Sequence, residues 1–285
     1  MTSIETAKVP SARRRQIVEY LAQNGAASVG QLSAALNVSL ATVHRDLRIL
    51  ESEGMLHRVQ GGATAIEMPS TTTEEGIESS FVRRVQKQGR AKLAVGVRAA
   101  QLIERGQTVF LDASTTALAL AAAIEASGMA VTLVTTSPAI AQTLSAPAVR
   151  VVMVPGQVDQ ELRIVTGSWA NEFLSTLNFA SAFVSCAGIG EDGSLFTESR
   201  EIQVTLQRAL SRSSRKICLL DSSKVGRTAS LMLCSADELD TMVLDSELPS
   251  EDAKRISAHG VEILTGSYAL PESLSESTIY RTYFA

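Results

Sequence analysis

The chain has 285 residues, of which 45% are hydrophobic and 20% charged, and its formal net charge is −4. This length has room for about two domains of ~150 residues each, and the composition excludes both a disordered tail and a uniformly basic nucleic-acid coat. Cys186, Cys218 and Cys234 show no C-x-x-C spacing and are odd in number, so we expect a reducing, cytoplasmic location. No stretch approaches the ~20 apolar residues of a membrane span, and residues 1–10 lack a signal-peptide core.

Charge is divided unevenly along the chain. Residues 1–65 carry seven basic and five acidic residues, a net of +2, and the rest carries 19 basic and 25 acidic residues, a net of −6. A DNA-binding head on a separate acidic domain has this distribution. Ordinary solvated surface charge explains so small a difference equally well.

The first 54 residues carry the signals of three helices. We expect a helix from Ser11 to about Asn24, a second that begins with a capping box at Ser28, and a third between a Ser39 cap and Gly54. A short helix, a tight turn and a longer helix predict a helix-turn-helix. The apolar stripes of the second and third helices are Leu32 and Leu36, and Val43, Leu47 and Leu50.

The face of the third helix opposite its apolar stripe is small and basic. Ala41 allows close approach to a major groove, and Arg45 and Arg48 can bond guanine or phosphate. A solvated helix face is the alternative, which two arginines do not exclude. The residues of this helix that we expect to contact DNA are Ser39, Ala41, Thr42, His44, Arg45 and Arg48.

Residues 55–66 form two short extended runs around Gly61 and Gly62, which predict a β-hairpin wing in which both glycines supply the positive φ of a tight turn. Arg58 then lies near the DNA backbone or minor groove. The segments 36–47 (LNVSLATVHRDL), 50–54 (LESEG) and 58–63 (RVQGGA) resemble the DeoR-type winged helix-turn-helix. Two departures are His44, where that family usually has arginine, and Gln60, where it usually has histidine.

Residues 67–80 are polar and without periodicity, so we expect a linker between a domain of residues 1–66 and one of residues 81–285. Beyond residue 81, strands that are apolar on both faces alternate with helices. This pattern favours an open, mostly parallel α/β sheet covered by helices on both sides. The predicted strands are 108–111, 131–134, 149–154, 181–186, 216–220, 241–244 and 261–264, and the clearest helices are 90–103, 115–126 and 138–144.

Small and polar residues follow five of these strands, at the end where parallel sheets bind ligands. Hydroxyl-rich turns at helix N-termini bind anions through their N–H groups, so this edge suits a small, polyhydroxylated anion. Helix caps, turn glycines and a surface ion pair are the plainer explanations of each residue taken singly. The candidate ligand-binding residues are Asp112, Ser114, Thr115, Thr116, Thr135, Thr136, Ser137, Gly156, Gly188, Asp221 and Lys224.

The segments 110–116 (FLDASTT), 134–137 (VTTS), 188–193 (GIGEDG) and 220–224 (LDSSK) resemble the DeoR sensor domain, which is similar in fold to ribose-5-phosphate isomerases. The resemblance implies a phosphorylated sugar as effector, with its phosphate near residues 114–116 and its hydroxyls near Asp112, Thr136, Asp221 and Lys224. Pro155 replaces the first glycine of the usual Gly-Gly. A lysine usual after residues 197–201 is also missing, with Gln203 and Arg208 nearby.

A sugar-phosphate isomerase is the main alternative. Isomerisation needs a carboxylate as general base, and the isomerase pattern has an acidic loop after the strand that here ends at Cys186, whereas this chain has no carboxylate before Glu191. No nucleophile motif or metal-ligand spacing involves the three histidines or the three cysteines. We therefore expect no catalysis, no cofactor and no metal.

Together these features predict a winged helix-turn-helix regulator that binds double-stranded operator DNA. By resemblance, it represses a carbohydrate-catabolism operon until a phosphorylated sugar binds. An effector must favour one of two arrangements of paired heads, so we expect a homo-oligomer, dimer or tetramer, without membrane contact. A constitutive DNA-binding protein whose second domain serves only assembly is the other alternative.

Overall fold

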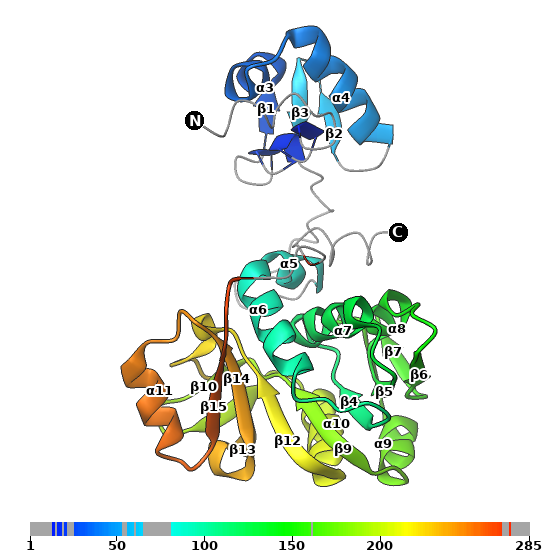
Figure 1. Cartoon of the computed structure of the whole chain (residues 1–285), viewed down its shortest axis with the longest axis vertical. Helices are drawn as coiled ribbons and strands as arrows, with labels where there is room; N and C mark the ends of the chain where they lie inside the picture. Colours follow the sequence, from blue (N-terminus) through cyan, green and yellow to red (C-terminus); the bar gives the residue numbers. More distant parts are fainter. Residues whose placement is uncertain are drawn as a thin grey trace. The chain divides into compact units, whose positions relative to one another are not determined.

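The structure is a computed structural model that describes residues 13–14, 16–18, 20–21, 26–52, 56–59, 61–64, 81–160, 162–269 and 274. The chain divides into two compact units, residues 1–76 and 77–285 (Figure 1). The expected linker 67–80, the expected helix ends at Asn24 and Gly54, and Gln60 lie outside the described residues. Within the described ranges no helix is both long enough and apolar enough to cross a membrane.

The amino-terminal unit contains the predicted helices. Residues 13–14, 16–18 and 20–21 are helical, and they are followed by α3 (Val29–Leu36) and α4 (Leu40–Ser52). The Ser28 hydroxyl accepts the N–H of Gln31, whose side chain accepts the N–H of Ser28, which confirms the capping box. The predicted apolar stripes are buried together with the first helical segment, in a core that includes Ile17, Leu21, Leu32, Leu36, Val43, Leu47 and Leu50.

The wing is a three-stranded antiparallel sheet of β1 (Ala26–Ser28), β2 (His57–Val59) and β3 (Gly62–Thr64), in the order β1-β3-β2. The predicted hairpin is β2 and β3, whereas β1 was not expected. The expectation that both glycines have positive φ is wrong, since only Gly61 does, at +82°. Gly62 serves another purpose: a Cβ there would collide with the carbonyl oxygen of Ala27, so glycine lets β3 lie against β1.

A buried ion pair joins the first helical segment to α4. The guanidinium of Arg13 donates from Nε to Asp46 Oδ2 at 2.5 Å and from Nη2 to Asp46 Oδ1 at 3.2 Å, and both residues are buried. Asp46 lies beside Arg45 on α4, and its pairing with Arg13 keeps the Asp46 carboxylate buried, away from the exposed Arg45 and Arg48. The charge on the outer face therefore stays positive.

The carboxy-terminal unit contains a seven-stranded sheet in the order β15-β14-β12-β9-β4-β5-β6, in which all neighbouring strands are parallel. All seven predicted strands are confirmed, with ends that differ by at most three residues. They are β4 (Thr108–Leu111), β5 (Val131–Thr135), β6 (Val149–Met153), β9 (Phe179–Val184), β12 (Ser213–Leu219), β14 (Thr241–Asp245) and β15 (Glu262–Gly266).

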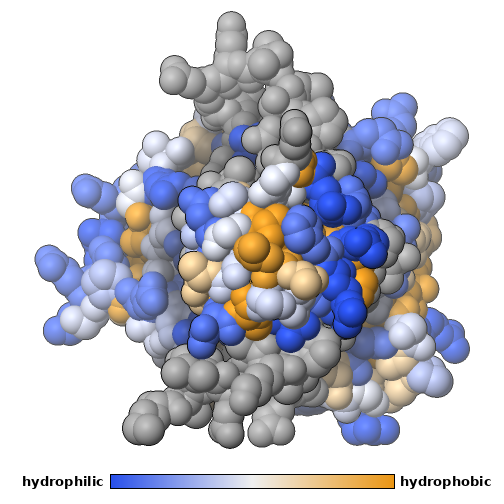
Figure 2. Space-filling model, turned by 90° about the horizontal axis from the view of Figure 1, so that it is seen from above, coloured by the Kyte–Doolittle hydropathy of each residue, from blue (hydrophilic) through white to orange (hydrophobic). Residues whose placement is uncertain are grey.

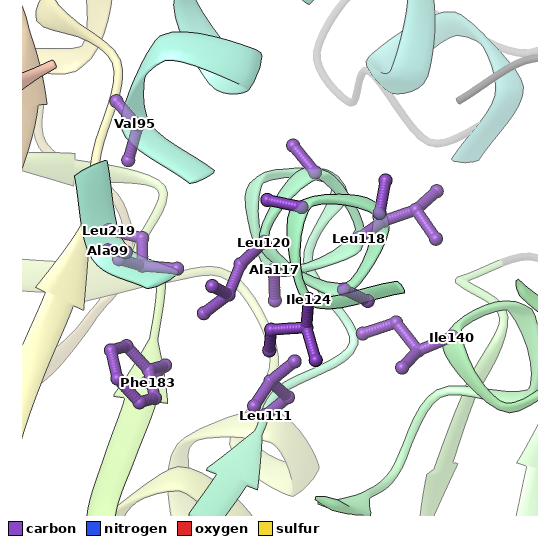
Figure 3. Packing of buried hydrophobic residues seen from close by; sticks show 14 of the residues in the cluster. Val95, Ala99, Leu111, Ala117, Leu118, Leu120, Ile124, Ile140, Phe183 and Leu219 are labelled. Carbon is purple, nitrogen blue, oxygen red and sulfur yellow. The ribbon is translucent and has the colours of Figure 1, made fainter. Parts of the chain in front are cut away.

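Helices cover both faces of this sheet, as its doubly apolar strands require. On one face Leu120 and Ile124 of α7 are directed toward the sheet, where Leu111 and Phe183 lie on neighbouring strands (Figure 3). The helices packed on this face are α5 (Phe81–Gln86), α6 (Gly89–Ala100), α7 (Thr115–Ser127) and α8 (Pro138–Thr143). The opposite face carries α9 (Ser168–Ser175), α10 (Arg200–Ser211) and α11 (Ser250–Ser257).

Antiparallel additions make the unit mostly, not wholly, parallel, as predicted. β7 (Gln157–Asp159) pairs with β8 (Ile164–Thr166), and β11 (Ser194–Thr197) lies between β10 (Gly188–Ile189) and β13 (Leu231–Ser235). Two short 3₁₀ turns, η1 (Ser222–Lys224) and η2 (Ala236–Glu238), follow β12 and β13. These pieces are too short for sequence periodicity to indicate them.

The strand order places a topological switch point between β4 and β9. The chain runs outward from β4 through β5 to β6, then returns to the other side of β4 and continues through β9, β12, β14 and β15. In open parallel sheets the loops that leave two such strands diverge and leave a crevice where ligands bind. The fold therefore favours the carboxyl ends of β4 and β9 as the binding edge.

Replacing Asp46 with alanine should destabilise the amino-terminal unit by roughly 3–5 kcal/mol, because it leaves the buried Arg13 charge without this carboxylate. Hydrogen exchange of α4 backbone amides measures the loss, with β4 amides as internal control. The matched variant R13M/D46L removes both charges and should lose less stability than D46A. Equal protection of α4 in wild type and D46A would contradict the structural role of the pair.

Candidate effector-binding edge and DNA-binding face

Asp112 lies at the switch point and forms hydrogen bonds with the loops that follow β4 and β9. Its Oδ2 accepts the backbone N–H of Ser185, just beyond β9, at 2.7 Å, and its Oδ1 accepts the backbone N–H and the hydroxyl of Ser114 at 3.0 and 2.6 Å. The side chain is buried. Both oxygens therefore hold the two diverging loops together, a positioning role that the sequence did not reveal.

Burial raises the pKa of the Asp112 carboxyl above its usual value of 3.8, against the hydrogen bonds from Ser114 and Ser185 and the positive charge of Lys224, which lower it. The cause is the cost of moving a carboxylate out of water. The folded chain consequently holds the Asp112 proton more strongly than the unfolded chain does.

The N-terminus of α7 lies directly after this loop. Ser114 is its N-cap, and its hydroxyl accepts the N–H of Ala117 at 3.0 Å. The Thr115 hydroxyl donates to the carbonyl oxygen of Arg84 at 3.4 Å. The hydroxyl of Thr116, fully buried in the first turn, has no hydrogen-bond partner in the structure, which is uncommon because buried polar atoms are nearly always paired.

A second unpaired hydroxyl follows the neighbouring strand. β5 pairs with β4, and Thr136, just after β5, is fully buried with its hydroxyl unpaired. Its neighbours are satisfied: the Thr135 hydroxyl accepts the N–H of Ser137, and the Ser137 hydroxyl caps α8 by accepting the N–H of Ile140. Among the hydroxyls predicted at this edge, those of Thr116 and Thr136 are thus the two that the structure leaves without a hydrogen bond.

Gly156 and Gly188 lie where the chain packs against itself. A Cβ on Gly156 would be 2.5 Å from the carbonyl oxygen of Thr166, and one on Gly188 would collide with the carbonyl oxygen of Arg227. Both glycines therefore allow close approach of two backbone segments. This need explains their presence without a ligand contact.

Lys224 reaches from η1 to the end of β9. Its ammonium donates to the carbonyl oxygen of Cys186 at 2.8 Å and to the hydroxyl of Ser185 at 3.4 Å, and the side chain is half-buried. Asp221, buried at the end of β12, accepts the hydroxyl of Ser223. The structure therefore brings Asp112 and Lys224 to the same pair of loops, with Asp221 on the neighbouring strand.

The contribution of α5 to this edge was not expected from the sequence. The carbonyl oxygen of Arg84 accepts the Thr115 hydroxyl and the ammonium of the buried Lys92, which also donates to the carbonyl oxygen of Lys87. The guanidinium of Arg84 donates to Leu162 in the β7–β8 turn at 3.4 Å. A basic helix thus lies against the first turn of α7, and no local pattern in the sequence signals that contact.

Gln203 and Arg208, the residues near the missing family lysine, are both on α10 and have different surroundings. Gln203 is buried, and its amide donates to the carbonyl oxygen of Met232 in β13, which ties α10 to the antiparallel sheet. Arg208 is exposed in the last turn of α10.

A cavity of about 400 Å³ lies nearby, between α10, β12 and β13, and is lined by Gln207, Lys216, Met232 and Cys234 among others. It is separate from the edge described above.

The three cysteines are buried in the core on the α10 side of the sheet. A hydrogen bond with Cys218 lowers the pKa of the Cys186 thiol and raises that of Cys218 well above 9.0. Burial raises the pKa of Cys234 to about 12. In the part of the chain that the structure describes, no group of three or more His, Cys, Asp or Glu side chains is placed to hold a metal ion.

The predicted DNA-binding residues form one exposed face of α4. Ala41, His44, Arg45 and Arg48 are exposed, while Ser39 and Thr42 form the helix cap, with the Ser39 hydroxyl accepting the N–H of Thr42 at 3.2 Å. On the wing, Arg58 pairs with Glu51 of α4 at 3.6 Å. Gly61 is exposed at the wing tip and Gly62 is buried.

Comparison with known proteins matches both units to one family. Residues 13–68 match the model of the DeoR-like helix-turn-helix domain, and residues 87–246 match that of the DeoR C-terminal sensor domain. The chain belongs to the DeoR family. It is a DNA-binding transcription regulator with a winged helix-turn-helix and an α/β sensor domain, as the sequence predicts.

Curated DeoR-family relatives align along most of the chain. A lactose phosphotransferase system repressor of Staphylococcus aureus is 30% identical over 238 residues, 82% of this chain and 92% of that protein. The transcriptional regulator GlpR of Haloferax volcanii is 28% identical over 258 residues, 90% of this chain and 98% of that protein. A putative aga operon transcriptional repressor of Escherichia coli O157:H7 is 26% identical over 255 residues, 89% of this chain and 93% of that protein.

Likeness to solved structures is slight. Ribose 5-phosphate isomerase A from Neisseria gonorrhoeae superposes with a TM-score of 0.36 at 16% identity, covering 47% of this chain and 52% of that one. eIF2B beta from Chaetomium thermophilum superposes with a TM-score of 0.41 at 12% identity, covering 84% of this chain and 68% of that one.

Replacing Asp112 with asparagine should cost about 1–3 kcal/mol at neutral pH, because the amide nitrogen can no longer accept a buried N–H. Since the pKa of Asp112 is raised in the folded state, wild-type stability falls as the pH rises above 3.8 toward the folded-state pKa. The difference between wild type and D112N should therefore shrink over that range. Urea unfolding at a series of pH values measures it.

Asp192 provides the matched control. It also accepts the N–H and hydroxyl of the serine two residues on, Ser194, but it is exposed and these bonds lower its pKa. Its stabilising contribution is present above pH 3.8 and is lost as the pH falls through the folded-state pKa. The difference between wild type and D192N should consequently decrease as the pH falls. The same trend in both variants would contradict the assignment for Asp112.

Proposed function

We propose that this regulator is a repressor of a carbohydrate-use operon whose sensor domain binds a phosphorylated sugar at the carboxyl ends of β4, β5 and β9, and that binding releases the operator. The observation that carries the proposal is the pair of fully buried, unpartnered hydroxyls of Thr116, in the first turn of α7, and Thr136, just after the neighbouring strand β5. A helix N-terminus favours an anion through its free N–H groups and dipole. Two hydroxyls without partners favour a ligand that supplies hydrogen-bonding oxygens.

Basic groups at the same edge support an anionic ligand. Lys224 lies at the end of β9, and α5 places Arg84 against the first turn of α7, where the Arg84 carbonyl oxygen accepts the Thr115 hydroxyl. Lys92 of α6 donates its ammonium to the same carbonyl oxygen. The proposal assigns the phosphate to residues 114–116 and the sugar hydroxyls to Thr136 and Lys224. Asp112 shapes the edge through its bonds to Ser114 and Ser185.

We further propose that the ligand is bound and not transformed, without cofactor or metal. A general base needs a carboxylate that can reach a substrate proton. Both oxygens of Asp112 already accept hydrogen bonds from the chain, and Asp221 accepts the hydroxyl of Ser223. These contacts support a structural role for the buried acids of this edge.

A repressor function also has consequences for the oligomeric state of the protein and for its location in the cell. Relatives named as repressors of lactose and aga systems support the carbohydrate role. We propose a homodimer or tetramer, because paired half-sites on DNA require paired heads, and the cytoplasm, because the target is chromosomal DNA. Sedimentation of the full chain tests the assembly.

Thr116→Val and Thr136→Val remove hydroxyls that have no partner, so each variant should unfold at the same or a higher temperature than wild type in the absence of ligand. Wild type should show a melting temperature that rises with the concentration of a panel of sugar phosphates. Each variant should lose most of that rise, because the ligand loses a hydrogen-bond partner. Thermal shift with and without ligand measures both effects.

Thr205→Val is the matched control, since the Thr205 hydroxyl on α10 is also buried and unpartnered but lies away from this edge. It should keep the full response to ligand. An equal response in all three variants would remove Thr116 and Thr136 from the site. No response of wild type to any sugar phosphate would overturn the sensor proposal.

Arg48→Ala should weaken operator binding by roughly 1–3 kcal/mol and relax selectivity at one base position if Arg48 contacts a base. The side chain is exposed on the outer face of α4, so folding should be unaffected. Fluorescence anisotropy with operator duplexes selected by the full-length protein measures the change. Arg215→Ala, an exposed arginine of the sensor domain, should leave binding unchanged.

A further inference from the structure

One exposed residue of α4, the recognition helix, lies outside the core that the described residues of the amino-terminal unit form. Leu40 is the first residue of α4 and is 53% exposed. It is not part of the unit's buried core, and the cap of the helix is supplied by Ser39. Single exposed leucines are common on protein surfaces. A function for Leu40 is therefore inferred from its position on α4.

Leu40 stands at the end of α4 that reaches bases in helix-turn-helix proteins, whose recognition helices contact base edges through their N-terminal residues. Residues three and four positions apart share a helix face, so Leu40 lies beside His44, with Arg48 a further turn along. All three are exposed. A leucine is thereby grouped with the side chains assigned to DNA.

The chemistry of the major groove offers one partner for an aliphatic side chain. Every base pair presents hydrogen-bonding groups there, and thymine alone adds a methyl group, at C5. Arg45 and Arg48 on the same helix favour phosphates and guanine. Figure 2 shows the hydrophobic residues on the face that it views in small groups among hydrophilic ones.

We propose that Leu40 is a specificity-determining residue that packs against the C5-methyl group of a thymine in each operator half-site. The inference rests on the DNA-binding role of the amino-terminal unit. Burial of the leucine and the methyl group together favours thymine over every base that lacks the methyl. The remaining contacts of α4 then fix the position of that thymine relative to the bases read by Arg45 and Arg48.

The test uses full-length protein and operator duplexes selected from a random pool. Each thymine is replaced singly by deoxyuridine, which keeps the Watson–Crick pairing and removes only the methyl group. In each half-site there should be one thymine whose single replacement weakens wild-type binding about fourfold, the effect of burying one methyl group. The variant L40A should bind the thymine and deoxyuridine duplexes equally well at that position, and selection with L40A should lose the preference for thymine there.

Val158→Ala, which shortens an equally exposed aliphatic side chain of the sensor domain, should keep the wild-type response to deoxyuridine. The proposal is overturned if L40A retains the wild-type ratio of affinities, if no deoxyuridine replacement affects wild type, or if the selected operators contain no fixed thymine. In each of these cases wild type still binds its selected duplexes. Failure to select any duplex would instead contradict DNA binding by the amino-terminal unit.

Discussion

The hydrogen bonds of Asp112 determine the geometry of the edge to which the ligand is assigned. They join the loop after β4 to the loop after β9, at the one point where the strand order reverses. Without this carboxylate the buried N–H of Ser185 and the half-buried N–H of Ser114 would lose their acceptor, and a buried N–H without a partner costs free energy comparable to a lost hydrogen bond. The raised pKa of Asp112 records the cost of keeping that acceptor out of water.

Some polar groups at this edge are hydrogen-bonded within their own loops, and others have no hydrogen-bond partner. Asp112, Thr135 and Ser137 bond to backbone N–H groups of their own loops, and they define the shape of the turn. The hydroxyls of Thr116 and Thr136 bond to nothing in the structure. The turns are thus held by hydrogen bonds of their own, while these two hydroxyls stay unpaired.

The contacts of α5 relate this edge to the rest of the chain. α5 directly follows the expected linker in sequence, and its Arg84 carbonyl oxygen accepts the hydroxyl of Thr115 in the first turn of α7. The same carbonyl accepts the buried ammonium of Lys92. The helix that follows the expected linker thus shares a hydrogen bond with the helix whose N-terminus we propose as the phosphate site.

The sequence by itself determined the two-unit organisation, the caps of α3 and α4, the seven strands and the edge at which polar residues gather, because caps and the period of buried side chains are local patterns. Only the tertiary structure decided which of these polar residues are already paired. Asp112 meets Ser185 across 73 positions, and Arg13 meets Asp46 across 33. The contact of α5 with α7, the strand β1 and the close approaches at Gly62 and Gly156 also join segments distant in sequence. Such contacts leave no periodic trace in the chain, since they arise from the packing of elements and not from the conformation of any one of them.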